Sequence, residues 1–328
     1  MSAIHPELLS FIEESLRQIN LSQIDPVLGS SIKYAVNGRG KHLRPLICSL
    51  STTLIGGDYR DAKDAIIAIE LLHDASLIHD DIIDEDPMRR GTPSIHNKYG
   101  IKTAVLTGDA MFTLGLRYAL KTGNPKIVDI LTATTIKMLQ GIAIQSKNRG
   151  RILTEEDYLN INYMKSGSLF EAAAEIGGMI ASGTPREIER LSLFGRHYGN
   201  AYQILDDICD AIIVDKTNGS DLNRGDISLP LIYALESSDI TREEKEQLTL
   251  VYKGKTEGDP NALLQIYEKT GTITRSQVKM REFSGMARRV LDDFNTSQAT
   301  DALQSMLDLY DTSDILSTVG SDLLYYLK

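Results

Sequence analysis

Two clusters of aspartates, each set in an apolar helical stretch, limit what this chain can fold into more than any other feature. Both have the spacing DDxxD: Asp80, Asp81 and Asp84 form the first cluster, and Asp206, Asp207 and Asp210 form the second. On a helix, residues four apart lie on one face, a turn apart. Carboxylates this close repel one another unless a cation lies among them. The sequence therefore predicts two helices that each require cations along one face.

Divalent metal ions would satisfy these acidic faces. Carboxylate oxygens are hard ligands, and Mg²⁺ in proteins is typically held by one or two carboxylates together with water and substrate phosphate oxygens. Two such helices facing each other would bind a diphosphate through shared ions. A solvated surface is the alternative for one acidic face. The repetition of the motif and the nearby Arg89 and Arg90 favour a metal–diphosphate site instead.

The composition is that of a globular protein. A length of 328 residues with 42% hydrophobic residues suits a substantial core, and we predict one domain over residues 1–328. The net charge of −10, without a basic stripe, excludes a nucleic-acid-binding surface. The two cysteines, Cys48 and Cys209, are expected to be buried reduced thiols. We expect no signal peptide, no apolar run of the roughly 18 residues that span a bilayer, and a cytoplasmic location.

The spacing of apolar residues predicts an all-α protein. These residues recur at three and four positions almost throughout, and glycine and proline separate about ten or more helices. Residues 101–120 and 127–144 are predicted to form buried helices. Residues 154–157 resemble a capping box at the start of another helix. The loop 216–230 mixes glycine, lysine and acidic residues, which is typical of a lid over a site.

Basic and polar residues outside the clusters complete a candidate site. The segment GRGKHLRP (38–45) is a basic turn loosened by glycines, so Lys41 and Arg44 would reach an anion closely. Lys165 and Ser166 lie on a later helix. Gln203 lies three residues before Asp206, which places its amide near the second acidic face.

With these residues in view, the chain resembles the trans-prenyl diphosphate synthases, the class I polyprenyl synthetase family. The resemblance covers roughly residues 37–235. It rests on GKHLRP, HDDIIDEDPMRRG, Lys165-Ser166, YQILDDICD and the loop from Lys216 to Pro230. It implies the isoprenoid synthase fold, an α-helical bundle around a deep central cavity, usually as a homodimer. The implied reaction joins isopentenyl diphosphate to an allylic diphosphate and yields a linear polyprenyl diphosphate.

The resemblance also assigns roles to matching positions. Three Mg²⁺ ions on the allylic diphosphate would be held by the two DDxxD motifs, with Asp80, Asp84 and Asp206 foremost and Asp81, Asp207 and Asp210 supporting. The allylic diphosphate would contact Arg89, Lys165, Ser166, Gln203 and Lys216, of which Lys165, Gln203 and Lys216 would be catalytic. The isopentenyl diphosphate would be bound by Lys41, Arg44, His73 and Arg90.

Small residues before the first motif bear on product length. Ala75 and Ser76 lie about one turn before Asp80, where short-chain members of the family tend to carry aromatics. We therefore expect a product of geranylgeranyl length or longer. Residues such as Met111, Phe112 or Met138 would set a deeper floor.

The chain departs from the family pattern at two positions. Asp226 stands where a lysine is usual and His42 where an arginine is common. Asp226 would either weaken allylic binding, so that a lysine restored there would strengthen it, or point to solvent.

Three other functions compete with the synthase interpretation. A non-catalytic regulatory subunit would lose its metal clusters, but both are complete in this sequence. A class I terpene cyclase would not need an isopentenyl site. A metal-dependent phosphohydrolase built on the pairs His73-Asp74 and His79-Asp80 leaves the second cluster unexplained.

Overall fold

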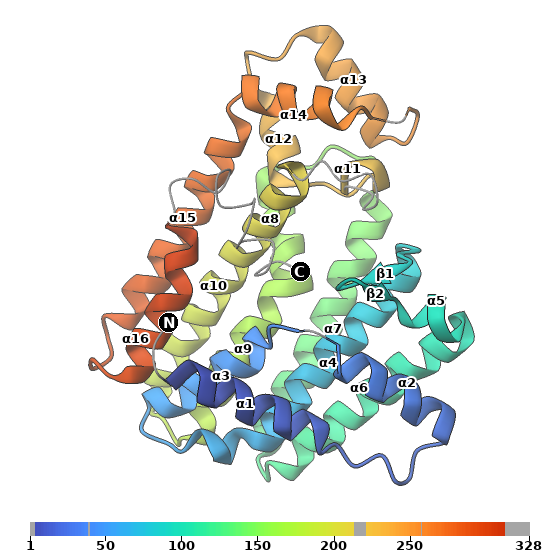
Figure 1. The fold of residues 1–328 in the computed structure, drawn as a ribbon. Helices are drawn as coiled ribbons and strands as arrows, with labels where there is room; N and C mark the ends of the chain where they lie inside the picture. Colours follow the sequence, from blue (N-terminus) through green and yellow to red (C-terminus); the bar gives the residue numbers. More distant parts are fainter. Residues whose placement is uncertain (1–3, 39, 213–220, 257, 312–328) are drawn as a thin grey trace.

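The computed structural model describes residues 4–38, 40–212, 221–256 and 258–311, and these residues are almost entirely helical (Figure 1). Within them the only sheet is a two-stranded antiparallel hairpin of β1 (Met88–Arg89) and β2 (Thr92–Pro93). The all-α class predicted from the sequence is therefore confirmed. A single domain over the whole chain remains a prediction.

The hairpin divides the helices into an earlier and a later group along the chain. Before the hairpin come α1 (Ile4–Arg17), α2 (Pro26–Val36), α3 (Leu43–Leu54), the 3₁₀ turn η1 (Tyr59–Ala62) and α4 (Lys63–Ile83). After it come α5 (Ile95–Tyr99), α6 (Ile101–Lys121), α7 (Pro125–Asn148), α8 (Glu155–Asn162), the π-helix η2 (Tyr163–Gly167), α9 (Ser168–Ile180) and α10 (Pro185–Ile212). The remainder comprises α11 (Asp221–Arg224), α12 (Leu229–Glu236), α13 (Arg242–Tyr252), α14 (Pro260–Lys269), α15 (Thr272–Leu291), α16 (Gln298–Leu307) and the 3₁₀ turn η3 (Asp308–Tyr310).

Glycines set how closely the central helices approach one another. A side chain at Gly177 on α9 would overlap the carbonyl oxygen of Cys48 on α3. A side chain at Gly195 on α10 would overlap the carbonyl oxygen of Phe170 on α9. Because protein interiors are close-packed, α3, α9 and α10 are held nearly backbone to backbone. This packing fixes the second acidic motif, on α10, relative to the basic turn that precedes α3.

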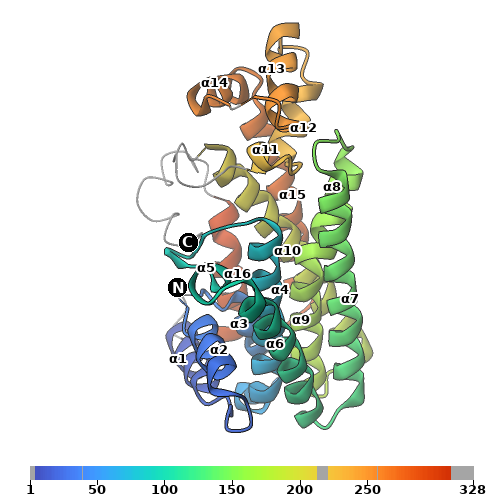
Figure 2. The same ribbon diagram turned by 90° about the vertical axis from the view of Figure 1, so that its right-hand side faces the viewer.

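The helices α6 and α7 are less buried than their sequences predict. Figure 2 shows them on the side of the molecule that faces the viewer. Exposed apolar side chains follow both helices: Ile101, Val105, Leu106 and Leu120 on α6, and Ile136, Leu139 and Ile144 on α7. The expectation of two buried helices was therefore wrong for one face of each.

The expectation that no apolar run reaches membrane-spanning length was also wrong. By length and composition alone, α7 is long and apolar enough to cross a membrane, and 33% of its most apolar window is buried in the protein. Burial in the core of this chain therefore does not explain why the exposed face of α7 is apolar.

The capping box predicted for residues 154–157 is confirmed. Thr154 caps α8 in a capping box with Asp157, in which each side chain bonds the other residue's backbone N–H. In Figure 1, α13 and α14 lie at one end of the molecule, beyond α12, on the same end as the C-terminus of α10. The first acidic motif falls at the C-terminal end of α4, and the second lies in the last two turns of the described part of α10.

Candidate active site

The first acidic motif lies where a helix least tolerates negative charge. Asp80 and Asp81 are in the last turn of α4, and Asp84 is its C-cap. The C-terminal end of a helix carries the negative end of the helix dipole, so carboxylates there require compensating cations. Each carboxylate is paired with a different basic side chain: Asp80 with Lys165 (Nζ at 3.3 Å), Asp81 with Arg89 (Nε at 2.8 Å) and Asp84 with Arg149.

The π-helix η2 supplies two of the polar groups. It widens one turn between α8 and α9 and carries both Lys165 and Ser166. Such π-turns occur frequently at functional sites because they redirect side chains. A side chain at Gly199 on α10 would lie 2.7 Å from the Cα atom of Gly167. Since Lys165 reaches Asp80 on α4, η2 lies between the two helices that carry the acidic motifs.

Arg44 is buried beside His73. Its Nη1 lies 3.1 Å from His73 Nε2, its Nη2 donates to Ser166 Oγ at 3.2 Å, and its guanidinium lies 4.1 Å over the Phe170 ring. Burial and the charge of Arg44 hold the pKa of His73 well below its usual value. His73 is therefore neutral, and its Nε2 accepts the hydrogen bond because a guanidinium only donates. The geometry joins α3, α4 and η2.

Lys41 is the clearest sign of an anion-binding position. Its Nζ is buried and, among the described residues, has no hydrogen-bond partner. Burial lowers the pKa of Lys41 to about 8, although the charge of Asp206 acts in the opposite direction. Arg90 is a further cationic neighbour that lowers this pKa. A buried ammonium without a hydrogen-bond partner among the described residues, influenced by the charge of another cation, is suited to an anionic ligand.

The second acidic motif has one aspartate with a structural role. Asp207 is buried and accepts from the Tyr158 hydroxyl at 2.7 Å, from Gln203 Nε2 at 3.2 Å and from the Leu229 backbone N–H at 3.3 Å. These bonds tie α10 to α8 and α12. Gln203 thus lies beside the acidic face, as its spacing predicts, but it contacts Asp207. Asp206 contributes to the pKa of Lys41, which links this motif to the basic turn.

The donor set fits Mg²⁺ held partly by a substrate. Within the described residues, no group of three or more His, Cys, Asp or Glu side chains is arranged to hold a metal ion alone. The carboxylates instead stand at single-turn spacing next to basic residues. This suits an ion that takes one or two protein carboxylates and completes its coordination with water and phosphate oxygens.

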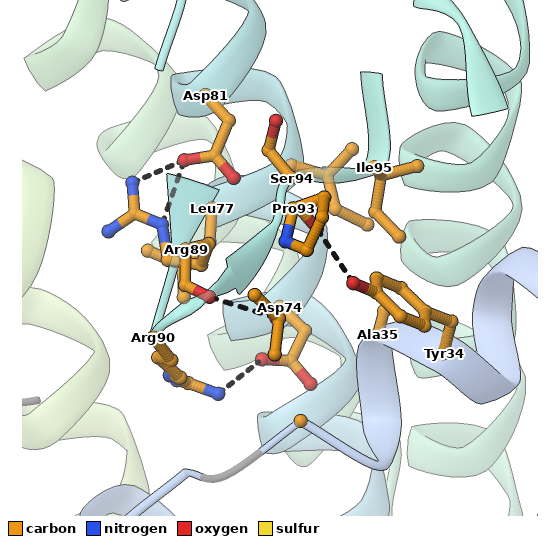
Figure 3. A pocket seen from close by; sticks show the side chains of 13 residues that line it. Tyr34, Ala35, Asp74, Leu77, Asp81, Arg89, Arg90, Pro93, Ser94 and Ile95 are labelled. Carbon is orange, nitrogen blue, oxygen red and sulfur yellow. Dashed lines mark hydrogen bonds and ion pairs between the residues drawn. The ribbon is translucent and has the colours of Figure 1, made fainter. Parts of the chain in front are cut away.

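Behind the first motif, the hairpin closes a small pocket (Figure 3). Asp81 pairs with Arg89 in this pocket, and Asp74 lies 3.7 Å from Arg90. The pocket is not lined by Ala75 or Ser76. Those two residues are buried in α4, and the Ser76 hydroxyl donates to the His73 carbonyl oxygen at 2.7 Å.

The structure describes one of the two predicted site positions in the 216–230 loop. Lys216 lies outside the described residues. Asp226 is buried, with 2% of its surface exposed, and its carboxylate is 2.9 Å from Arg149 Nε. The alternative in which Asp226 points to solvent was therefore wrong, because two arginines hold it inside: Arg149 and, at 3.7 Å, Arg224.

Several residues of the site were missed from the sequence. Arg149, the C-cap of α7, and Tyr158 on α8 contact the acidic motifs, and a lone arginine or tyrosine in those segments gives no signal. A buried pair of His42 and Glu70, 2.6 Å apart, supports the basic turn. Its signal was present: a glutamate in an apolar helix requires a partner.

Comparisons with known proteins show the family to which the chain belongs. Residues 25–270 match the family model described as polyprenyl synthetase. The chain is 31% identical over 306 residues to the short chain isoprenyl diphosphate synthase of Methanothermobacter thermautotrophicus, covering 90% of this chain and 93% of that protein. A decaprenyl diphosphate synthase from Rhodobacter capsulatus has a similar structure, with a TM-score of 0.86, 26% identity and coverage of 93% and 95%. So does a polyprenyl synthase from Caulobacter crescentus complexed with calcium and isoprenyl diphosphate, with a TM-score of 0.83, 25% identity and 93% of each chain covered.

Lys41→Met is expected to stabilise the free protein at neutral pH. The lysine pKa is about 8 when folded and 10.5 when unfolded, so folding at neutral pH confines a charge that the unfolded chain carries freely. With its partial exposure discounted, the variant should raise the free energy of unfolding by about 1–3 kcal/mol below pH 8. The gain should fade as pH rises towards 10.5. Urea unfolding across this pH range measures it, and a less stable variant at pH 7 contradicts it.

Proposed function

We propose, since the chain belongs to the polyprenyl synthetase family of chain-elongating prenyltransferases, that it condenses isopentenyl diphosphate with an allylic diphosphate with the assistance of Mg²⁺. The family and reaction class follow from the comparisons. One observation carries the finer assignment to residues. The buried Lys41 ammonium, unpartnered among the described residues, lies near enough to Asp206 and Arg90 to feel the charge of both, and a diphosphate there would satisfy it.

The two aspartate motifs would hold the metal. Asp80, Asp84 and Asp206 are the proposed ligands of three ions, and Asp81, Asp207 and Asp210 support them. Bound Mg²⁺ would neutralise the diphosphate group that leaves the allylic carbon. The calcium and isoprenyl diphosphate of the Caulobacter crescentus structure support a divalent ion in this fold. Lys165, which contacts Asp80 at 3.3 Å, would donate to the same diphosphate together with Ser166, Gln203, Arg89 and Lys216.

Lys41, Arg44 and Arg90 would bind isopentenyl diphosphate. His73 orients Arg44 because its neutral ring accepts one guanidinium N–H. Glu70 and Asp74 hold His42 and Arg90 in turn, at 2.6 and 3.7 Å. The basic turn therefore has a buried acidic support, which fixes its direction.

For the reaction itself, the protein then has to do little more than position the two substrates and exclude water from them. When the allylic C–O bond breaks, the bonding pair leaves with pyrophosphate and the allyl fragment becomes a cation. The double bond of isopentenyl diphosphate attacks that cation and forms the new C–C bond. Loss of a proton to the released pyrophosphate restores a double bond, so no dedicated protein base is needed. Apolar helical walls would keep water from the cation.

A product of geranylgeranyl length or longer is proposed from α4. Ala75 and Ser76 are both small and buried one turn below Asp80. The relatives do not decide the length, because they include a short chain synthase and a decaprenyl diphosphate synthase.

A homodimer is proposed from the apolar faces of α6 and α7. These helices lie side by side, and both expose apolar residues along their outer faces. A second copy covering them would explain why α7 is apolar well beyond its buried third.

Activity and its metal requirement test the proposed function. Purified protein with Mg²⁺, isopentenyl diphosphate and allylic primers of increasing length should yield elongated diphosphates, and chelation should stop the reaction. Asp80→Asn should lower kcat by about a hundredfold or more, because a ligand charge is lost where charge develops. Asp129→Asn, an exposed aspartate on α7, is the matched control. Absence of elongated product from the wild type, or full activity of Asp80→Asn, contradicts the proposal.

Ala75→Phe is expected to shorten the product. An aromatic ring at this fully buried position would block the space beneath the diphosphate. Reversed-phase chromatography of the reaction products measures chain length. Ala302→Phe on α16, equally buried, controls for overpacking alone and should leave the length unchanged. The pocket assignment is wrong if Ala75→Phe makes the same product as the wild type.

Leu139→Arg is expected to break the dimer. This residue is 44% exposed on α7, and a guanidinium there would be buried without a partner in the proposed interface. Size-exclusion chromatography with light scattering should show a dimer for the wild type and a monomer for the variant. Val278→Arg on α15, an apolar residue of similar exposure (49%), should remain dimeric. A monomeric wild type rules out this interface.

A further inference from the structure

Asp226 is a buried carboxylate that two arginines share. Arg149 donates to it through Nε at 2.9 Å and through Nη2 at 3.2 Å, which is the paired geometry of a guanidinium on a carboxylate. Arg224 approaches the same carboxylate at 3.7 Å. Because Asp226 is 2% exposed, these arginines are anchored from inside the protein.

Arg149 also reaches the first acidic motif, and Arg224 reaches a carboxylate just after it. Arg149 Nη2 donates to Asp84, which caps α4, and Arg224 Nη1 donates to Asp86 at 2.9 Å. Arg149 therefore binds one carboxylate that is buried and structural and another that belongs to the proposed metal site. The hydrogen bonds to Asp226 and Asp84 raise the pKa of Arg149, although burial opposes them.

The backbone holds this anchor in place. The Gly150 N–H donates to the Gly225 carbonyl oxygen at 2.9 Å, so the residues next to Arg149 and Asp226 are bonded directly. Gly225 has φ of +75°, and a side chain there would lie 2.9 Å from the Tyr252 carbonyl oxygen. Tyr252 in turn donates to the Arg151 carbonyl oxygen at 2.8 Å. The Asp226–Arg149 pair is thus fixed by the segment after α7, by α13 and by the loop between α11 and α12.

We infer that Arg149 is an additional diphosphate-binding residue, positioned by Asp226, and that it exchanges Asp84 for a phosphate oxygen when metal binds. The inference rests on the proposed function and deepens it. In the free protein Arg149 neutralises Asp84, which is the task of a metal ion in the loaded site. When Mg²⁺ takes Asp84, the guanidinium stays on Asp226 and keeps N–H groups for the incoming diphosphate.

This arrangement accounts for an acidic residue where a lysine is usual. A lysine at position 226 would present one ammonium to the diphosphate. Asp226 instead presents the guanidinium of Arg149, which can bind a phosphate with two parallel hydrogen bonds. A lysine restored at 226 would face Arg149 and Arg224 at close range, so it would weaken diphosphate binding. This reverses the expectation drawn from the sequence.

Titration calorimetry with inorganic pyrophosphate, at a series of Mg²⁺ concentrations, tests the inference on the whole protein. Arg149→Gln should weaken pyrophosphate binding at saturating Mg²⁺ by about tenfold or more, because a charge-assisted hydrogen bond is lost. The same variant should lower the Mg²⁺ concentration that half-saturates binding, because Asp84 no longer holds an arginine. If Arg149 had only a structural role, the variant would bind pyrophosphate more weakly and would also need a higher Mg²⁺ concentration for half-saturation.

Companion variants separate binding from positioning. Arg151→Gln, an exposed arginine two residues away, should behave as the wild type. Asp226→Asn should weaken pyrophosphate binding less than Arg149→Gln does. The double variant should be no weaker than Arg149→Gln alone if Asp226 acts through Arg149. Arg149→Lys should restore part of the affinity as a point charge.

Two results overturn the inference. One is unchanged pyrophosphate affinity in Arg149→Gln, with thermal unfolding showing a folded protein. The other is weaker binding accompanied by a higher Mg²⁺ requirement, which indicates general damage to the site. In both cases the wild type would still bind pyrophosphate with Mg²⁺ and elongate primers. Failure of the wild type to do either instead refutes the proposed function.

Discussion

Negative charge at the C-terminal end of α4 is the constraint from which the site follows. A helix end of this polarity repels carboxylates, yet α4 ends in a DDxxD motif. In the free protein, basic side chains from separate segments form ion pairs with the carboxylates of α4. They come from the hairpin, from η2 and from the end of α7. The same cations are then in place for a diphosphate, whose charge would arrive with its own metal. The same basic side chains therefore neutralise the motif in the free protein and would bind the substrate.

That arrangement is costly for stability. Lys41 is buried and, in the described part of the chain, has no hydrogen-bond partner, while burial and Glu70 raise the pKa of Asp74 to about 7. Perturbed pKa values of this kind are common where a site is arranged to bind a ligand and not to stabilise the free protein. The close packing of α3, α9 and α10 through Gly177 and Gly195 offsets the cost, because the apolar side chains of these helices are buried beside the site.

How far the sequence could predict this structure depends on the range of each interaction. The helices and both motifs follow from local period, and the capping box at Thr154 follows from four residues. The partners of the aspartates do not, since Arg149 and Asp84 lie 65 positions apart and the segment around Arg149 has no distinctive pattern. The spacing of apolar residues also gave a wrong prediction of burial for one face of α6 and of α7. An apolar stripe looks the same whether it faces a core or a surface that a second chain could cover.

The charge at position 226 shows why residue type alone is a weak guide to a binding site. From the sequence, an aspartate near a diphosphate suggests a loss of two units of charge relative to a lysine. In the structure Asp226 carries Arg149 and Arg224 with it, so the cationic character returns through different side chains. A buried carboxylate with two guanidinium partners is also harder to displace than a lysine on a flexible stem, because breaking it would leave an unpaired charge inside. What must be preserved at such a site is the sum of charges facing the ligand, and a chain can supply that sum from any segment that its fold brings near.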